Sequence, residues 1–249
     1  MRDKRGAQRG CRTRVCVAKL CRVNADRQVT TEMDVRGFTL GMMLLAMSTQ
    51  PTRAQVLDRS SSTEPRAWIS GALGLFDLGV VDDGVTATSW RFANAAQFRA
   101  SLEYSLGRGN SIGVLAAYAR VPLRYAPFTG TAEDALSTVS ALALTFHGGG
   151  GVGLHQVIET SVGALRYSDF TSEENGQPLA PPGTDLDVTF IIGAGFGYSI
   201  GTRTQIVLVQ DFGIALHQRT DLPNDASTST YYRTTRLGLR YGVGTATRR

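Results

Sequence analysis

The sequence predicts an all-β fold, an eight-stranded antiparallel up-and-down β-barrel. Two observations carry this prediction. Apolar and polar residues alternate with period two along eight segments of the chain, which is typical of strands with two chemically different faces. The connections between these segments are alternately long and short, as they must be when every second connection lies at the same end of a barrel.

The first 54 residues differ from the rest in charge and in cysteine content. They hold 11 Lys and Arg against 4 Asp and Glu, whereas residues 55–249 hold 15 against 17. The basic excess therefore lies in this segment, and we expect no nucleic-acid partner. All three cysteines, Cys11, Cys16 and Cys21, lie there too, without a CxxC pair or a nearby histidine. Neither a metal nor a cofactor is expected from that pattern.

Residues 33–54 have the three parts of a secretory signal peptide: a charged start, the apolar run Phe38–Met47, and a polar end with a small residue. The apolar run is too short to span a bilayer as a helix, which takes about 20 residues. Cleavage is predicted between Ala54 and Gln55. Residues 1–32 are then either a long n-region or an upstream extension. We favour the extension, because signal peptides run about 15–30 residues.

Residues 55–65 form a short polar segment, and the barrel is predicted over 66–244, with a tail at 245–249. The clearest strand is Trp90–Leu106, in which Phe98 and Leu102 share one face while Arg99 and Glu103 share the other. In chain order the expected strands are Trp68–Phe76, Trp90–Leu106, Ser111–Arg120, Ser137–His147, Gly153–Tyr167, Asp187–Ile200, Arg203–His217 and a last strand around Arg236–Val243.

The connections predict which end of the barrel is which. Three are short: Gly107–Asn110, Gly148–Gly151 and Gly201–Thr202. Four are long: Asp77–Ser89, Pro122–Leu136, Ser168–Gly183 and Gln218–Ser229. Bacterial outer-membrane barrels have an even number of strands, short periplasmic turns and longer external loops. The pattern therefore predicts a transmembrane barrel with short periplasmic turns and four longer external loops.

Alternation alone does not decide which face is outside, since a soluble lipocalin-like binding barrel has the same period. Three features favour a lipid-facing apolar side. The polar face is rich in small residues, which suit the narrow interior of an eight-stranded barrel; they are Gly113, Ala117, Gly163, Gly193, Gly195, Gly197, Gly213, Gly238 and Gly242. Residues 55–249 contain no lysine. Aromatic residues also collect near strand ends.

These aromatic residues predict two girdles at the membrane surfaces. Tyr104, Phe146, Tyr198 and Tyr241 lie by the short turns, and Trp90, Phe92, Tyr118 and Tyr231 lie by the long loops. Arg120, Arg166 and Arg233 share the apolar face but lie at the long-loop end, beyond the apolar band. Gln210 also shares that face, in mid-strand, and the pattern does not explain it.

With these features the chain resembles the small eight-stranded outer-membrane barrels of the OmpA-like and OmpX-like porin fold. The resemblance covers residues 66–244 and rests on architecture and on glycine–aromatic strands such as Gly193–Tyr198. It implies a location in the outer membrane, contact with outer-membrane lipid and lipopolysaccharide, insertion by the barrel assembly machinery, and a monomer. Such barrels often end on an aromatic residue, whereas this chain continues through Gly244–Arg249.

The polar face predicts an ion-pair network in the lumen, because unpaired charges are costly in a narrow interior. Its members are Arg99, Glu103, Glu159, Asp211, Arg236 and Arg240. We expect an outer-membrane barrel with a structural or surface-exposed role and a polar, largely plugged lumen. The alternatives are a narrow gated pore, a lipid A-modifying enzyme and the soluble binding barrel. His217 lies near the external rim, but no nucleophile motif accompanies it, so no enzymatic activity is expected.

Overall fold

The computed structural model describes residues 64–181, 184–217 and 229–245. The predicted signal peptide, its cleavage site at Ala54 and Gln55, the extension 1–32 and the three cysteines lie outside these residues. The described chain is built of strands, and none of its residues form a helix long and apolar enough to cross a membrane. The strands are β1 (Ala67–Leu78), β2 (Val80–Asp83), β3 (Thr88–Phe92), β4 (Ala95–Gly107), β5 (Asn110–Pro127), β6 (Glu133–Gly148), β7 (Gly153–Ser172), β8 (Thr184–Ile200), β9 (Thr204–Leu216) and β10 (Ser229–Val243).

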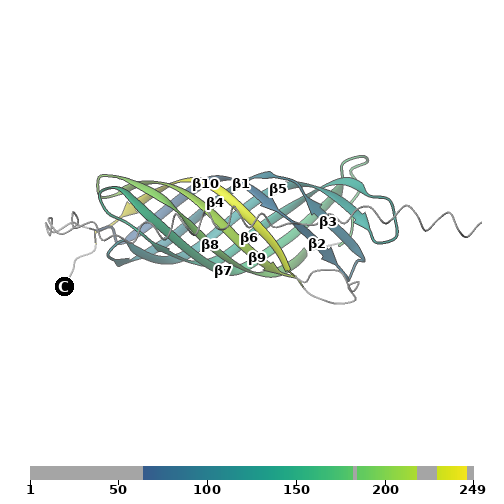
Figure 1. The fold of residues 1–249 in the computed structure, drawn as a ribbon, viewed down its shortest axis with the longest axis horizontal. Coiled ribbons are helices and arrows are strands. Elements are labelled where there is room, and N and C mark those ends of the chain that lie inside the picture. Colours follow the sequence, from purple (N-terminus) through teal and green to yellow (C-terminus); the bar gives the residue numbers. More distant parts are fainter. Residues whose placement is uncertain (1–63, 182–183, 218–228, 246–249) are drawn as a thin grey trace, which may run out of the picture. The chain divides into compact units, whose positions relative to one another are not determined.

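Eight of these strands, β1 and β4–β10, form a closed antiparallel barrel (Figure 1). Each pairs with the next along the chain, and β1 closes the ring by pairing with β10, Ala67 opposite Val243, and with β4, Ala67 opposite Tyr104. The predicted eight-stranded barrel is therefore confirmed. The short turns lie at residues 108–109, 149–152 and 201–203, all at one end of the barrel, and the strand ends that lead into the long connections lie at the other end.

The long-loop end contains more strand than the sequence predicts. The connection between β1 and β4 holds the hairpin β2–β3, and β5 and β6 continue to Pro127 and from Glu133 into the predicted loop. Backbone pairing continues there, with Arg124 opposite Asp134. These strands extend the barrel at its long-loop end, where the β2–β3 hairpin lies (Figure 1).

The predicted single strand Trp90–Leu106 is wrong in one respect: it is two strands, β3 and β4, separated by a bulge. Both pair with the same edge of β5, Phe92 opposite Leu123 and Gln97 opposite Ala119. Residues 93–96 thus lie opposite residues 120–122 of β5. The stretch between β3 and β4 has one residue more than its partner, which makes it a one-residue β-bulge. An extra residue reverses which side chains face inward.

The bulge overturns the prediction that Trp90 and Phe92 belong to the lipid-facing girdle. Both side chains point into the barrel, and Trp90 is fully buried. Arg91, which the alternation places inside, is exposed for the same reason. A second bulge lies in β7, where residues 169–170 face Ser137 between the pairs Thr138–Ser168 and Leu136–Thr171. It turns Phe170 inward as well.

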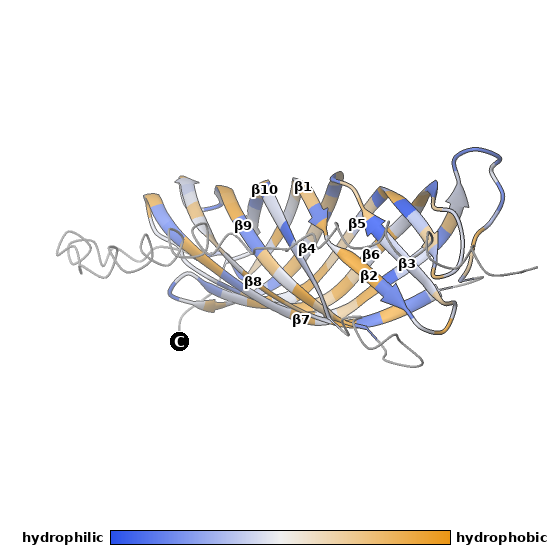
Figure 2. Ribbon diagram, turned by 45° about the vertical axis from the view of Figure 1, so that its right-hand side comes forward, coloured by the Kyte–Doolittle hydropathy of each residue, from blue (hydrophilic) through white to orange (hydrophobic). Residues whose placement is uncertain are grey.

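The outer surface of the barrel is apolar. Large exposed side chains on it include Leu73, Leu75, Phe98, Leu102, Leu142, Leu144, Phe190, Ile192, Phe196, Leu208, Phe212, Leu237 and Leu239. The other six predicted girdle residues also face outward: Tyr104, Phe146, Tyr198 and Tyr241 by the short turns, and Tyr118 and Tyr231 nearer the long loops. Apolar and polar residues alternate along the strands (Figure 2). An apolar band of this extent around a polar interior suits a barrel in lipid and is the reverse of a lipocalin.

Two polar residues on the outer surface, Arg233 and Gln210, have partners on neighbouring strands. Arg233 donates to Asp77 on the neighbouring strand at 2.7 Å, and both are exposed to solvent. Gln210, which the alternation leaves unexplained, lies opposite Thr235 on β10 and accepts a hydrogen bond from its hydroxyl. Its amide nitrogen donates to the carbonyl of Asp211 at 3.2 Å. Both polar atoms of the Gln210 side chain therefore have a hydrogen-bond partner within the protein.

Inward-facing glycines make room for large side chains on the adjacent strand. Gly213 lies directly opposite Tyr232, and a methyl group added to it would overlap the tyrosine ring. Gly193 faces Asp211 in the same way. At these two positions a glycine on the polar face leaves room for a larger inward side chain on the next strand, as expected in the narrow interior of an eight-stranded barrel.

Candidate functional site

The inward side chains form layers that follow one another along β10. Arg240, Arg236 and Tyr232 succeed each other from the short-turn end to the long-loop end, all facing the lumen and all buried. Gln205 and Asp211 on the neighbouring β9, and His217 directly after it, run in the same direction. Inward side chains from the other strands also contribute to each of these layers.

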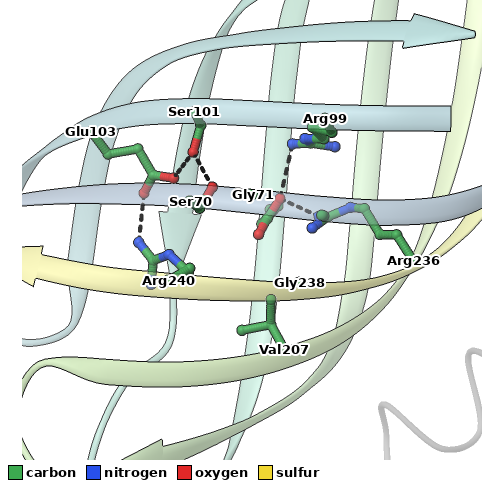
Figure 3. Close-up of a pocket in the computed structure, with 11 residues that line it drawn as sticks. Ser70, Gly71, Arg99, Ser101, Glu103, Val207, Arg236, Gly238 and Arg240 are labelled. Carbon is green, nitrogen blue, oxygen red and sulfur yellow. Dashed lines mark hydrogen bonds and ion pairs between the residues drawn. The ribbon is translucent and has the colours of Figure 1, made fainter.

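The middle layer is a lattice of two arginines and two carboxylates. Figure 3 shows its two arginines, Arg99 and Arg236, pointing toward each other across the lumen. Arg236 donates to Asp211 at 2.7 Å and to Glu159, while Arg99 reaches the same two carboxylates at 3.1 and 3.0 Å. Their side chains are all less than one-tenth exposed. Four strands, β4, β7, β9 and β10, supply one residue each, so the lattice ties opposite walls of the barrel together.

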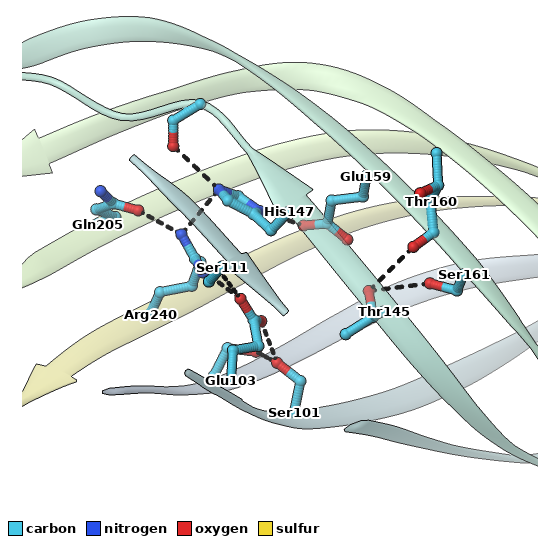
Figure 4. A network of polar contacts seen from close by, with 12 residues as sticks. Ser101, Glu103, Ser111, Thr145, His147, Glu159, Thr160, Ser161, Gln205 and Arg240 are labelled. Atoms are coloured by element: carbon cyan, nitrogen blue, oxygen red, sulfur yellow. Dashed lines mark hydrogen bonds and ion pairs between the residues drawn. The ribbon is translucent and has the colours of Figure 1, made fainter. Parts of the chain in front are cut away.

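The layer below it centres on Arg240 (Figure 4). Arg240 donates to Glu103 at 2.6 Å and to Gln205 at 2.8 Å, and its guanidinium lies 4.8 Å from the ring of Trp68. Glu103 also accepts hydrogen bonds from Ser101 and Ser111. The carboxylate is thus enclosed by donors on three strands.

His147 links the two layers, and the sequence did not predict its role. Its Nε2 lies 2.8 Å from Arg240 and its Nδ1 lies 3.0 Å from Glu159. The same Nε2 lies 3.2 Å from the carbonyl oxygen of Gly149, so it faces a donor and an acceptor at once. The parity of β6 places His147 inward, but only the three-dimensional pairing shows which charges it meets.

The six predicted network residues, Arg99, Glu103, Glu159, Asp211, Arg236 and Arg240, lie together in these two layers. Little space is left among them. A cavity lined by Ser70, Arg99, Glu103, Arg236 and their neighbours has a volume of about 10 Å³, room for about one water molecule. The charged side chains of the two layers are therefore packed closely against one another.

Above the lattice lies an aromatic layer that we call the aromatic plug: Phe76, Trp90, Phe92, Tyr167, Phe170 and Tyr232. The Trp90 ring lies 4.6 Å from Phe170 and 5.8 Å from Tyr167, and Phe92 stacks on Tyr167 at 5.9 Å. Phe76 and Tyr232 meet edge to face at 5.6 Å. These six side chains belong to one cluster of buried residues that also includes Val81 of β2, Leu123 and Tyr125 of β5 and Leu165 of β7.

Beyond the plug, at the long-loop end, His217 lies among three carboxylates. Its Nδ1 is 2.7 Å from Asp187, and its Nε2 is 3.6 Å from Asp185 and 3.8 Å from Asp83. The imidazole packs edge-on against Trp90 at 5.7 Å. Trp90 on β3 is paired with Tyr125 on β5. Tyr125 lies nearer the long-loop end of β5 than the outward-facing Arg120 does. This cluster therefore lies beyond the membrane-spanning band.

The carboxylates control the charge of His217. Burial alone would lower its pKa, but the hydrogen bond to Asp187 and the negative charges of Asp187, Asp185 and Asp83 outweigh burial and raise the pKa of His217. Among the described residues, none of these three carboxylates forms an ion pair with an arginine. The sequence identifies His217 as a rim residue but not its three partners, which come from β2 and β8.

No protein-family model matches the sequence, and no curated protein is similar enough to count as a relative. Several solved structures share the fold. Neisserial surface protein A has 8% identity and a TM-score of 0.50, with 71% of this chain and 96% of that one covered. The outer membrane protein OprG of Pseudomonas aeruginosa has 12% identity, a TM-score of 0.45 and coverage of 73% and 98%. The attachment invasion locus protein Ail of Yersinia pestis has 14% identity, a TM-score of 0.39 and coverage of 72% and 98%. The first of these shows that the chain has the fold of the small outer-membrane barrels.

Proposed function

We propose that this protein, which has the fold of the small outer-membrane barrels, is an outer-membrane barrel with a structural, surface-exposed role and a lumen closed to ions. One observation carries the proposal. The lattice of Arg99, Arg236, Glu159 and Asp211 spans the lumen, and its two positive charges are balanced by two negative charges. On this proposal, the aromatic plug blocks the lumen at a second level, nearer the long-loop end.

The balance of charge argues against a pore. A selective channel uses rings of one sign of charge to attract its ion. Here two arginines meet two carboxylates, and Arg240 meets Glu103, so neither layer has an excess of either sign. Opening the lumen would also require separating buried ion pairs, since removing a partner leaves an uncompensated charge. A narrow gated pore is therefore the weaker proposal.

Planar-bilayer conductance tests the closed lumen. The purified wild type is expected to give no current steps, and Arg233→Ala, which changes an exposed outer arginine, serves as the matched control. Arg236→Ala removes the arginine that contacts both Glu159 and Asp211, and it is expected to stay silent as well because the aromatic plug remains. Regular openings of the wild type that disappear or change size in Arg236→Ala would contradict the proposal and establish the gated pore.

We propose that the protein reaches the outer membrane through the signal peptide at 33–54. On this view, its apolar surface contacts outer-membrane lipid and lipopolysaccharide, the barrel assembly machinery inserts it, and it works as a monomer. The apolar outer band supports the membrane location. The test is fractionation followed by the intact mass of the mature protein, for which we expect an N-terminus at Gln55. A mature chain that still begins upstream of Met33 would overturn the signal-peptide proposal.

We propose a non-enzymatic role. The hydrogen bond from His217 to Asp187 has the geometry of the orienting pair of a catalytic triad. Within the described residues, however, the other ring nitrogen faces Asp83 and Asp185 instead of a serine hydroxyl. Lipid A from cells with and without the gene is expected to have the same mass spectrum. A change that depends on His217 would replace this proposal with the lipid A-modifying enzyme.

A further inference from the structure

We propose that Asp83, Asp185 and His217 form a binding site for a divalent transition-metal ion at the external end of the barrel, with Zn²⁺ as its probe. One ligand atom from each residue lies within 4.8 Å of the other two. Asp83 ends β2, Asp185 begins β8, and His217 follows β9. The site is thus built where three strands converge above the aromatic plug. No sequence motif predicts it, because the three residues are far apart in the chain.

The separations suit ligands of one ion better than hydrogen bonds. Nε2 of His217 lies 3.6 Å from Asp185 and 3.8 Å from Asp83, beyond hydrogen-bonding distance of both. Ligands placed about 2.0–2.1 Å from a tetrahedral Zn²⁺ lie about 3.4 Å apart. Since the three ligand atoms lie within 4.8 Å of one another, side-chain shifts of about 1 Å would bring both carboxylates into reach of an ion bound to Nε2. The three protein ligands would leave a fourth position for water.

The groups behind the ligands orient them as they do in metal sites. Asp187 lies opposite His217 in the β8–β9 register and holds its Nδ1 at 2.7 Å, which directs Nε2 toward the other two carboxylates. A carboxylate behind a metal-binding histidine is a common arrangement. Asp83 is fixed by the backbone N–H groups of Val85 at 2.9 Å and Thr86 at 3.2 Å. The site is therefore preorganised rather than a loose group of acidic residues.

The charge of the cluster is a second, independent argument for a cation. Three carboxylates surround one imidazole, so even a protonated His217 leaves an excess negative charge. Asp83, Asp187 and His217 are each at least nine-tenths buried, where uncompensated charge is costly. The second oxygen of Asp187 and the hydroxyl of Tyr167 are also buried there, and neither has a hydrogen-bond partner among the residues that the structure describes. A divalent cation would supply the missing positive charge.

The ligand types select the class of ion. Imidazole nitrogen with carboxylate oxygen suits Zn²⁺ and similar divalent transition-metal ions, whereas Ca²⁺ takes six to eight oxygen ligands. The described cluster offers one nitrogen and few oxygens. We therefore expect Zn²⁺ to bind and Ca²⁺ to bind at least tenfold more weakly.

The test measures Zn²⁺ binding to the full chain folded in detergent. Cys11, Cys16 and Cys21 are changed to serine, because thiolates would bind zinc elsewhere. After treatment with EDTA, isothermal titration with Zn²⁺ is expected to show one ion per chain, and Co²⁺ is expected to give the absorption of a tetrahedral nitrogen–oxygen site. Asp185→Asn and His217→Gln should each weaken binding at least tenfold, and Asp187→Asn should weaken it about 10- to 100-fold.

His155→Gln is the matched control, since His155 lies by the short turns at the opposite end of the barrel and should leave binding unchanged. Heat-modifiable migration on SDS gels checks that each variant is folded. A Zn²⁺-induced rise in the melting temperature of the chain without its cysteines tests the site without any site variant. Three results would overturn the proposal: no Zn²⁺ binding or melting shift in that chain, equal binding by His217→Gln, or tighter binding of Ca²⁺ than of Zn²⁺.

Discussion

The indole of Trp90 lies 4.6 Å from the ring of Phe170, and each ring reaches the lumen through a one-residue bulge in its own stretch of strand. Without the bulges both side chains would face outward. The two irregularities therefore build the aromatic plug, which separates the ion-pair lattice from the carboxylates at the external end. Bulges that redirect side chains are common at the rims of barrels.

Trp90→Ala is expected to destabilise the barrel strongly. The indole is fully buried among Tyr167, Phe170 and His217, and truncating such a side chain costs about 3–5 kcal/mol. Unfolding in guanidinium, followed in lipid vesicles, measures the loss. Val85→Ala, in the exposed connection between β2 and β3, is the control and should change little. Equal stability of Trp90→Ala and wild type would mean that the plug is not packed as described.

Gly163→Ala should impair folding, whereas Gly71→Ala should not. A methyl group at Gly163 would overlap the carbonyl of Leu142 and the backbone of Ala143 on the neighbouring strand, while one at Gly71 meets no atom within 4 Å. Overpacking of this kind costs about 1–3 kcal/mol or more. The folded fraction on unheated SDS gels gives the comparison. Similar behaviour of the two variants would contradict the close approach of β6 and β7.

Glu159→Gln is expected to cost about 3–5 kcal/mol, because it leaves Arg99 and Arg236 with one carboxylate between them. Asp77→Asn breaks the exposed pair with Arg233 and should cost at most about 1 kcal/mol. Both losses are measured as free energies of unfolding in the same detergent. A Glu159→Gln barrel as stable as Asp77→Asn would show that the lattice contributes no more than a surface ion pair.

Gln210 and Thr235 should behave as a coupled pair on the lipid-facing surface. Thr235→Val removes the donor to Gln210 and is expected to cost about 1–3 kcal/mol, since an unsatisfied polar atom stays in an apolar environment. Adding Gln210→Leu should restore most of the stability, because both partners are then apolar. A double-mutant cycle on unfolding free energies measures the coupling. Additive losses in the double variant would refute it.

The strand number and the direction of the faces were predictable because lipid imposes them. An apolar outer face and a polar lumen require period-two alternation, and the positions of Phe98 and Arg99 on β4 follow it. The six lumen charges could be chosen by the same parity. The strand register then decides which of them meet, as it does for Arg240 and Glu103.

The bulges were not predictable from alternation, for a physical reason. A bulge reverses the inward face, and the pattern reveals it only if the two faces differ in polarity. At the long-loop end both faces accept apolar side chains, lipid outside and the aromatic plug inside, so Trp90 and Phe98 share one continuous pattern although they face opposite ways. The cluster around His217 could not be predicted from the sequence, because its members lie on β2, on β8 and directly after β9, and only the folded barrel brings them together.

Tryptophan fluorescence in vesicles of brominated lipid tests the central claim most directly. The chain has two tryptophans, Trp68 and Trp90, and both face the closed interior. Bromine atoms on lipid chains quench only indoles that touch the lipid, so the emission should equal that in ordinary lipid. A control with Trp68→Phe, Trp90→Phe and Phe98→Trp, which places the only indole on the outer surface, should be quenched. Strong quenching of the wild type that is lost in Trp90→Phe would return Trp90 to the lipid-facing girdle and contradict the bulge, the plug and the closed lumen together.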